Sequence, residues 1–410
     1  MNAHALSRRR GRRSRPRSLW PIAVRTLIAL LALATTPAVA AAEQKLLTID
    51  TPSKYVDVKT AVFNGDPPKV LHANVLLPEG YDAGKKRWPV LYLLHGVGDN
   101  YSDWAKPDKG DIKNTAKGFP GIIVMPEGGK GFYTNWYNGG KRKDPAWESY
   151  FENELMPQVA RRFRIAAGRR NHAIAGLSMG GMGATYLGSQ RPDYFGAVGT
   201  FSGFVEHQRE TVSAGFGAVA GVNYEDIFGP MEGEYASGHN PTKLAYNLQN
   251  TPVFQAFGNG VADPAKGDSA PAAAVELEIS QENEEFHTAL ETAGVKVDYQ
   301  PQAGVHDWPY WRSHLQAAIK WGFFGRAESK ANPLQWTYST IATAGRMWNF
   351  RFSFAKPPDK VATFERLGPV LSGKGEGTVR LVDIPTGCAY TVKLPFKRSK
   401  GVPPKQKRCR

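Results

Sequence analysis

The chain contains few cysteines and lacks the common motifs for binding metals or nucleotides. Only Cys388 and Cys409 occur in its 410 residues, which excludes the paired cysteine ligands of a zinc ribbon. No H-E-x-x-H, P-loop or dinucleotide-binding motif is present, so the sequence indicates no cofactor and no metal. The two cysteines would form one disulfide in an exported protein or remain two unpaired thiols, and their spacing does not choose.

Long apolar runs are also missing. The run from Leu27 to Ala34 near the N-terminus is too short to span a bilayer, which needs about twenty residues. It follows an arginine-rich stretch and precedes Ala38-Val39-Ala40, the small residues of a signal-peptide cleavage site. We therefore expect residues 1–41 to be a cleaved signal peptide, with a retained anchor as the alternative. The mature protein would be secreted or associated with the cell envelope, and would have no membrane span.

Acidic residues are absent from both ends of the chain. Eight Arg occur in the first 25 residues, and eight Lys or Arg occur between Lys393 and Arg410. Removing both groups from the net charge of +15 leaves −1 for everything between them. The folded body is therefore close to neutral, and the basic composition does not predict a nucleic-acid-binding protein. The basic tail, residues 397–410, is instead a candidate for contact with anionic cell-wall polymers.

Two patterns of secondary structure follow one another between these ends. Across residues 71–324, short apolar strands alternate with amphipathic helices, which is typical of an α/β fold with a mostly parallel sheet and helices on both faces. Within it, residues 204–250 are rich in glycine and should form loops or a lid. After Gly325, short strands separated by Gly and Pro predict a small antiparallel β-module. We expect a catalytic domain at residues 42–328 and the β-module at residues 329–396, serving as a packing appendage or a carbohydrate- or wall-binding unit.

Seven strand patterns and four helix patterns mark the catalytic domain. The strand patterns lie at residues 75–77, 90–94, 122–125, 172–175, 198–201, 253–257 and 295–299. The helix patterns lie at residues 147–162, 179–190, 282–292 and 311–323.

A serine motif stands at one strand-to-helix junction. Gly176-Leu177-Ser178-Met179-Gly180 has the form G-x-S-x-G, directly after one strand pattern and at the start of a helix pattern. This context indicates a nucleophile elbow, in which a strained turn exposes the serine hydroxyl and the glycines permit close backbone approach. Ser178 is therefore the candidate nucleophile, with a structural serine in a glycine-rich turn as the alternative. The backbone N–H of Met179 is the first candidate donor of an oxyanion hole.

A histidine late in the chain has the position of a general base. His306 lies in the loop after the strand pattern 295–299 and before the helix pattern 311–323, and it is the only one of the nine histidines in such a loop. A serine nucleophile needs a base within hydrogen-bond reach. We therefore expect His306 to be the general base, and a solvated loop histidine is the alternative reading. His314, further along the helix, is more typical of a surface or packing residue.

The sequence gives weaker signals for the acid that would complete a Ser-His-acid triad and for the second oxyanion donor. An acid that orients the imidazole should follow the strand pattern 253–257. Asp263 lies on that loop, and Glu276 and Glu278 lie further on, so that spacing alone leaves all three open. The second oxyanion donor should come from the loop after the strand pattern 90–94, where Val97 is the candidate.

Five motifs in this chain recur in the same order in a known group of enzymes. They are Tyr92-Leu93-Leu94-His95-Gly96, Phe132-Tyr133-Thr134-Asn135-Trp136-Tyr137, Gly176-Leu177-Ser178-Met179-Gly180, Gly258-Asn259-Gly260 and His306-Asp307-Trp308-Pro309-Tyr310-Trp311. Together they resemble the antigen 85 mycolyltransferases and the related esterase D-like esterases, both α/β-hydrolases. The resemblance covers residues 71–324 and leaves out the β-module.

The resemblance also bears on the acid and on the substrate. In the antigen 85 pattern the acid is a glutamate in the helix after the Gly-Asn-Gly turn, and an ungapped count places it at Glu276. The plainer esterases have an aspartate directly after the strand, which would be Asp263. Antigen 85 enzymes hold trehalose with an Asp-Gly-Leu-Arg segment, whereas this chain has His95-Gly96-Val97-Gly98, the form of general esterases.

These observations predict an exported serine carboxylic-ester hydrolase that works through an acyl-enzyme on Ser178. The alternative is an acyltransferase of the cell envelope that passes the acyl group to a sugar hydroxyl, with glycolipids or sugar esters as substrates. A third hypothesis is a non-catalytic protein that binds wall or matrix polymer. The nucleophile, base and acid candidates argue against this third reading, because a pure binder does not need them together.

Overall fold

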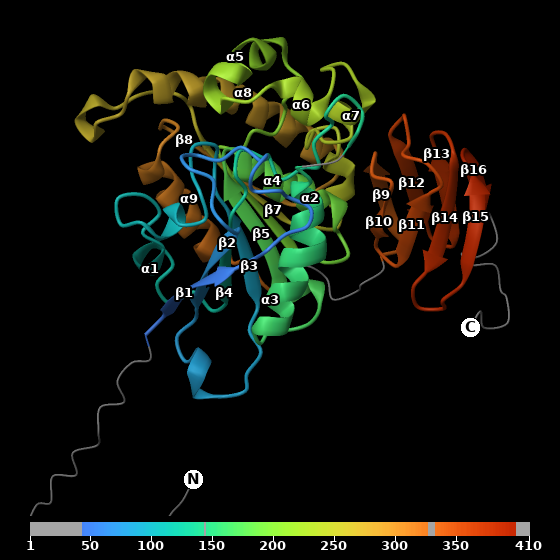
Figure 1. Cartoon of the computed structure of the whole chain (residues 1–410), viewed down its shortest axis with the longest axis horizontal. Coiled ribbons are helices and arrows are strands. Elements are labelled where there is room, and N and C mark those ends of the chain that lie inside the picture. The colour runs from blue at the N-terminus through green and yellow to red at the C-terminus, as the bar shows by residue number, and fades with distance from the viewer. Residues whose placement is uncertain (1–42, 143–144, 327–332, 399–410) are drawn as a thin grey trace, which may run out of the picture. The chain divides into compact units, whose positions relative to one another are not determined.

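The computed structural model describes residues 43–142, 145–326 and 333–398, all of which belong to one compact unit that begins at Ala41 (Figure 1). The predicted signal peptide and all but the first two residues of the basic tail lie outside the described residues. No helix in the described ranges is long and apolar enough to cross a membrane.

An eight-stranded sheet forms the centre of the first domain. Its strands stand in the order β1-β2-β4-β3-β5-β6-β7-β8. The pairs β1–β2 and β2–β4 are antiparallel, and the other five pairs are parallel. The bounds are β1 Lys45–Asp50, β2 His72–Leu77, β3 Val90–Leu94, β4 Ile122–Pro126, β5 His172–Leu177, β6 Ala197–Phe201, β7 Val253–Gly258 and β8 Val297–Gln302. The mostly parallel sheet expected from the sequence is confirmed.

Alternation along the central strands builds two hydrophobic cores, one on each face of the sheet. In β3, Val90, Tyr92 and Leu94 belong to one core, while Leu91 and Leu93 belong to the other. Successive side chains of a strand point to opposite faces, so a strand that is buried on both faces must be apolar throughout. This requirement explains why the central strands are continuous apolar runs.

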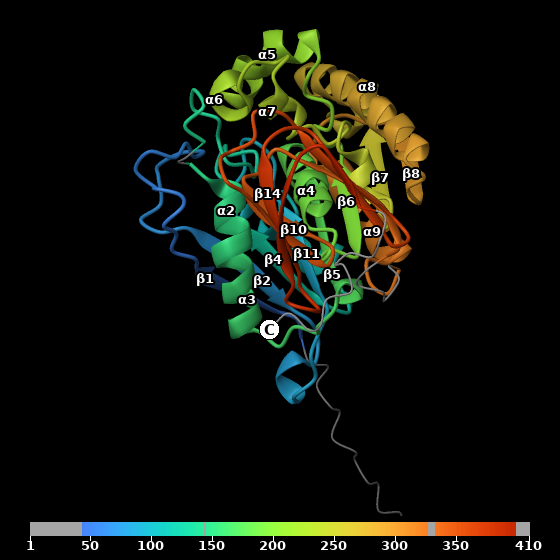
Figure 2. The same ribbon diagram turned by 90° about the vertical axis from the view of Figure 1, so that its right-hand side faces the viewer.

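Helices cover both faces and one end of the sheet. Residues of α2, α3 and α4 enter the first core, and residues of α1 and α9 enter the second. The short helices α5, α6 and α7 lie above one end of the sheet (Figure 1), and α8 packs along β7 and β8 (Figure 2). The bounds are α1 Ile112–Thr115, α2 Trp147–Tyr150, α3 Met156–Arg162, α4 Met179–Gln190, α5 Glu210–Ala220, α6 Tyr224–Phe228, α7 Glu234–Ser237, α8 Ala270–Thr292 and α9 Trp308–Trp321.

The C-terminal residues form two antiparallel sheets of their own, in the orders β10-β11-β14-β15 and β16-β13-β12-β9. The bounds are β9 Gln335–Thr340, β10 Ala344–Met347, β11 Phe350–Phe354, β12 Ala362–Leu367, β13 Val370–Lys374, β14 Thr378–Asp383, β15 Ala389–Lys393 and β16 Phe396–Arg398. Buried aromatic residues, among them Trp336, Phe352 and Phe364, form a separate core. The expected antiparallel β-module is therefore confirmed.

Candidate active site

The turn between β5 and α4 holds Ser178 in a strained backbone conformation. Its φ is 52° and its ψ is −121°, a combination that is costly for a residue with a side chain. The flanking glycines are required by space: a Cβ at Gly176 would lie 2.3 Å from the carbonyl oxygen of Gly180, and one at Gly180 would lie 2.6 Å from that of His95. The sequence thus builds a tight elbow that presents the serine hydroxyl to a cavity at the end of the sheet.

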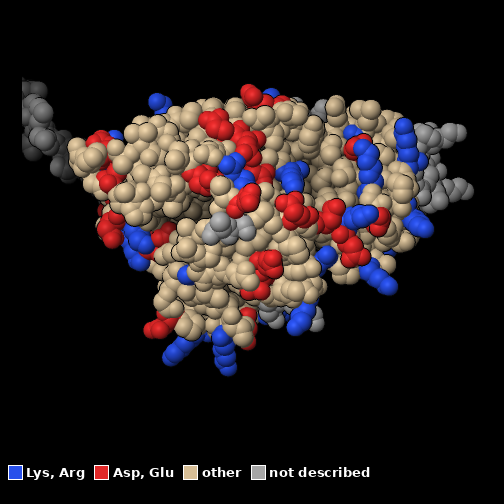
Figure 3. Space-filling view, turned by 90° about the horizontal axis from the view of Figure 1, so that it is seen from above, with Lys and Arg blue, Asp and Glu red and all other residues tan. Residues whose placement is uncertain are grey.

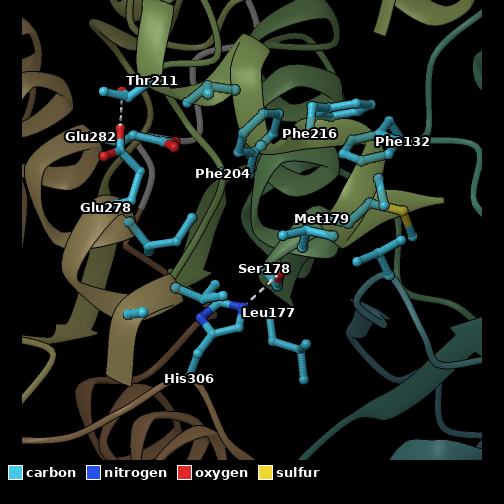
Figure 4. Close-up of a pocket in the computed structure, with 18 of the residues that line it drawn as sticks. Phe132, Leu177, Ser178, Met179, Phe204, Thr211, Phe216, Glu278, Glu282 and His306 are labelled. Carbon is cyan, nitrogen blue, oxygen red and sulfur yellow. Dashed lines mark hydrogen bonds between the residues drawn. The ribbon is translucent and has the colours of Figure 1, made fainter. Parts of the chain in front are cut away.

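His306 occupies the loop between β8 and α9 and faces this serine. Its Nε2 lies 2.9 Å from the Oγ of Ser178 (Figure 4). The backbone N–H of His306 donates to the carbonyl of Ala272, and its ring packs edge-on against Trp311 at a centroid distance of 5.0 Å. These contacts fix the position of the imidazole without using either of its nitrogens.

Glu276 on α8 completes the chain of hydrogen bonds. One of its oxygens, Oε2, lies 2.6 Å from Nδ1 of His306. The other, Oε1, accepts from the hydroxyl of Ser202 at 2.6 Å and from the backbone N–H of Gly258 at 2.5 Å. Burial by itself would raise the pKa of Glu276, but the bonds from His306, Ser202 and Gly258 outweigh it and lower the pKa. A buried carboxylate with three donors is an ionised acceptor, so Nδ1 of the histidine carries a proton and Nε2 is free to accept one.

The other two acid candidates, Asp263 and Glu278, form hydrogen bonds with groups other than His306. Asp263 caps a short turn, where its Oδ1 accepts from the backbone N–H of Ala265 at 3.1 Å. Glu278 accepts from Nε of Arg209 at 2.8 Å. Of the three candidates, all of which the structure describes, only the carboxylate of Glu276 is hydrogen-bonded to His306.

Both candidate oxyanion donors border the same cavity as the serine. Met179 is the first residue of α4, where backbone N–H groups have no partner within the helix. Val97 follows β3, and its N–H has no hydrogen-bond partner among the described residues. The two loops touch, because a Cβ at Gly96 would lie 3.3 Å from the Cβ of Ser178. The arrangement can therefore offer two donors to a negative oxygen that forms next to the serine.

A set of buried polar groups behind the oxyanion loop was not anticipated from the sequence. Nδ1 of His95 lies 2.8 Å from the carbonyl oxygen of Gly96, and the hydroxyl of Tyr133 lies 3.1 Å from both the backbone nitrogen and the oxygen of His95. Burial lowers the pKa of His95, but the carboxylate of Glu127 outweighs it, so that the pKa is raised. These contacts hold the loop that carries Val97. His95 and Tyr133 both stand in motifs that carry the family resemblance, but nothing in the sequence shows that the tyrosine, 38 residues later, contacts the histidine.

The cavity in front of the serine has a volume of about 560 Å³. One side is aromatic and aliphatic, with Phe132, Phe204 and Phe216 in mutual ring contact, and the other side is a wall of α8 (Figure 4). The full set of lining residues is Val97, Phe132, Leu177, Ser178, Met179, Phe204, Thr211, Val212, Gly215, Phe216, Val219, Ala220, Ala274, Val275, Glu278, Ile279, Glu282, His306 and Trp311. A cavity of this size and composition suits an apolar group of a small-molecule substrate.

Side chains at the start of α5, which borders the cavity, bind side chains of α8. Arg209 contacts Glu278 and Glu285, and the hydroxyl of Thr211 donates to Glu278 at 2.7 Å. The segment expected to form loops or a lid therefore contains short helices, one of which covers the cavity. Acidic and basic side chains both lie on the face of the molecule seen from this end (Figure 3).

Comparison with known proteins assigns the family. Residues 67–321 match the family model Esterase. The chain belongs to this esterase family. It is 29% identical over 254 residues to the diacylglycerol acyltransferase/mycolyltransferase Ag85A of Mycobacterium leprae, a match that covers 57% of this chain and 74% of that protein. It is 30% identical over 266 residues to the MPT51/MPB51 antigen of Mycobacterium bovis, covering 62% and 80%.

Other relatives of this esterase match a similar share of the chain. Esterase Rv1288 of Mycobacterium tuberculosis is 30% identical over 249 residues, and the match spans 57% of this chain and 52% of that esterase, about half its length. The solved structure of Mycobacterium tuberculosis MPT51 superposes with a TM-score of 0.52 at 23% identity, covering 67% of this chain and 97% of that one. A ferulic acid esterase superposes with a TM-score of 0.51 at 24% identity, covering 68% and 98%. The α/β-hydrolase fold and the resemblance to the antigen 85 and esterase group are confirmed.

Proposed function

We propose that this esterase is an exported serine carboxylic-ester hydrolase that acts through an acyl-enzyme on Ser178. The observation that carries the proposal is the unbroken chain of hydrogen bonds from the Glu276 carboxylate through His306 to the serine hydroxyl, at 2.6 and 2.9 Å. This is the arrangement that activates a serine by a base held in one tautomer.

The first half of the reaction forms the acyl-enzyme. Oγ of Ser178 attacks the ester carbonyl carbon while Nε2 of His306 takes the hydroxyl proton. The carbonyl oxygen becomes an oxyanion, which accepts hydrogen bonds from the backbone N–H groups of Met179 and Val97. The C–O bond to the alcohol then breaks, and His306 returns the proton to the leaving alcohol. Glu276 stays ionised throughout and stabilises the imidazolium.

The second half releases the acid. Water attacks the acyl carbonyl, Nε2 of His306 takes a proton from it, and the bond to the serine oxygen breaks as that proton returns to Oγ. If a sugar hydroxyl attacks in place of water, the same steps give acyl transfer. The match covers 74% of the mycolyltransferase Ag85A, which supports acyl transfer as the second candidate function. The His95-Gly96-Val97-Gly98 segment favours hydrolysis, because it lacks the charged residues expected to hold trehalose.

A pair of assays tests the proposal. Hydrolysis of a short p-nitrophenyl ester should be lost in Ser178→Ala, on the order of a million-fold in kcat, while the variant keeps the thermal unfolding temperature of the wild type. Adding trehalose should leave the rate of nitrophenol release unchanged and yield no acylated sugar. Formation of the sugar ester would favour the transferase, and normal turnover by a folded Ser178→Ala protein would refute both.

Export and attachment to the envelope form a separate part of the proposal. Cys388 is disulfide-bonded, and the chain has one other cysteine, Cys409, which lies outside the described residues. Structural disulfides are typical of proteins outside the cytoplasm. Together with the signal-peptide pattern in residues 1–41, this supports a secreted or envelope-associated enzyme whose basic tail, residues 397–410, binds anionic wall polymers.

A further inference from the structure

One carboxyl group in the wall of the active-site cavity has an oxygen without a partner. Glu282, on α8, is fully buried, with 0% of its surface exposed. Its Oε2 accepts from the backbone N–H of Glu206 at 3.2 Å, while Oε1 has no hydrogen-bond partner. No salt bridge among the described residues includes Glu282. A buried polar atom left without a partner is costly, and native proteins rarely keep one without a use for it.

The surroundings of this carboxyl favour its uncharged form. Burial raises the pKa of Glu282 well above its usual range. The nearby carboxylates of Glu278 and Glu206 raise it further, and the backbone N–H groups of Glu206 and Val205 only partly offset these effects. A protonated carboxylic acid has one O–H that can donate a hydrogen bond, whereas a carboxylate can only accept.

The position of this group relative to Glu276 follows from the helix. Glu282 lies six residues after Glu276 on α8, so it stands about 9 Å further along the helix axis, at 1.5 Å per residue. Between them the cavity wall contains Glu278 and Ile279. Figure 4 shows Glu282 and Glu278 on the side of the cavity opposite the aromatic residues, with Ser178 and His306 at its base.

We propose that Glu282 is a specificity-determining residue, which donates a hydrogen bond to a hydroxyl oxygen at the end of the acyl group remote from the ester carbonyl. The preferred substrates are then esters of hydroxylated acids whose chain is otherwise apolar. The aromatic wall takes the apolar part, and the acid on α8 takes the oxygen. The inference rests on the proposed ester hydrolysis and adds the class of acyl group.

Two esters of equal size test this inference. The full chain is assayed with p-nitrophenyl 8-hydroxyoctanoate and with p-nitrophenyl nonanoate, which have a hydroxyl and a methyl group at the same place. The quantity measured is the ratio of kcat/KM for the hydroxylated ester to that for the plain ester. In Glu282→Met this ratio should fall about ten-fold to a hundred-fold, mainly through loss on the hydroxylated ester, because a site that offers a hydrogen bond discriminates by that order.

Matched variants separate this role from a structural one. Glu282→Gln keeps a donor and should keep the ratio within a few-fold of the wild type. Glu291→Met makes the same change on the solvent side of the same helix, where the glutamate side chain is 68% exposed, and should leave the ratio unchanged. Glu282→Met removes an unpartnered buried oxygen but also the acceptor of the Glu206 N–H. These effects oppose each other, so the variant should unfold at a temperature close to that of the wild type.

Two results would overturn the inference, and they differ from failure of the proposed function. If both esters are hydrolysed and the ratio is the same in wild type and Glu282→Met, Glu282 has no such role. In the wild type alone, a series of hydroxyoctanoates with the hydroxyl at carbons 4, 6 and 8 should show a maximum near the far end, and a flat profile also refutes the inference. If neither ester is hydrolysed, the proposed esterase function itself fails and the inference fails with it.

Discussion

Replacement of Glu276 by glutamine should remove most of the activity while leaving the shape of the site intact. Both oxygens of the carboxylate accept hydrogen bonds. Oε1 accepts from the hydroxyl of Ser202 and from the backbone N–H of Gly258, and Oε2 accepts from Nδ1 of His306. An amide has only one acceptor oxygen. Because two fixed donors face Oε1, the amide oxygen should turn to them and its NH₂ group to the imidazole.

That orientation changes the tautomer of the base. Nδ1 of His306 then accepts from the amide, and the proton moves to Nε2, which can no longer accept the proton of Ser178. The imidazolium also loses its counter-charge. We expect Glu276→Gln to lower kcat on the order of ten-thousand-fold, which corresponds to about 5.4 kcal/mol of transition-state stabilisation at 1.36 kcal/mol per factor of ten.

The assay is the hydrolysis of a p-nitrophenyl ester at neutral pH, with Asp263→Asn as the matched control. The control makes the same carboxylate-to-amide change on a side chain that is 45% exposed and caps a turn, so its kcat should stay within about three-fold of wild type, as for surface changes of small free energy. The reasoning is refuted if Glu276→Gln keeps a tenth or more of the wild-type kcat. It is also refuted if Asp263→Asn lowers kcat more than Glu276→Gln does.

Stability against pH gives a second readout for the same variant. The pKa of Glu276 is lowered in the folded protein, so its ionised form contributes stability that is present above the unfolded pKa. That contribution is lost as the pH falls through the folded value. The difference in unfolding temperature between the wild type and Glu276→Gln should therefore shrink in acid. A difference that does not change with pH would show that the carboxylate is not ionised in the folded state.

Two other predictions concern residues away from the reaction. Burial, reinforced by the charge of Glu152, raises the pKa of Glu148 to about 8, so the folded state holds a proton that the unfolded chain releases, and stability falls as the pH rises toward 8. Glu148→Gln should thus stabilise the protein at pH 9 by on the order of 2 kcal/mol and by less at pH 5, measured by urea unfolding; an equal effect at both would contradict this. Deletion of residues 399–410 should leave kcat for a small ester near wild type and weaken binding to an anionic wall polymer. The affinity of the intact protein for this polymer should fall as the salt concentration rises. Binding that is insensitive to salt or to the deletion would contradict the role of the tail.

The central strands could be predicted closely because burial on both faces makes them continuous apolar runs. The pattern at residues 90–94 coincides with β3, and those at 122–125 and 253–257 are each one residue short of β4 and β7. The last strand was less accurate: the pattern 295–299 was expected, while β8 covers Val297–Gln302. This edge strand is half-buried or exposed throughout, so hydrophobicity does not mark its end.

The largest error concerned α8, expected at residues 282–292 and observed at Ala270–Thr292. Two residues at its start are typical of a helix N-terminus: Ser269, whose side chain accepts from the backbone N–H of Ala272, and Pro271 in the first turn. Using them would have placed Glu276 inside a helix from the sequence alone. The serine and histidine are marked by local motifs, but the acid is not, because its position depends on how far the preceding loop extends before the helix begins.

The buried stripe of α8 gives a physical reason why this helix carries more than one functional group. The residues buried on it are Glu276, Ile279, Glu282, Asn283, Phe286 and Leu290. Their spacing of three and four residues is that of a helix face packed on a core, where charged residues are almost never found without partners. The two glutamates on this face differ in their partners. Three donors lower the pKa of the first, whereas the second has one oxygen without a partner, and burial raises its pKa. The first environment favours a permanent anion that orients a base, and the second favours a neutral acid that can donate to a bound molecule.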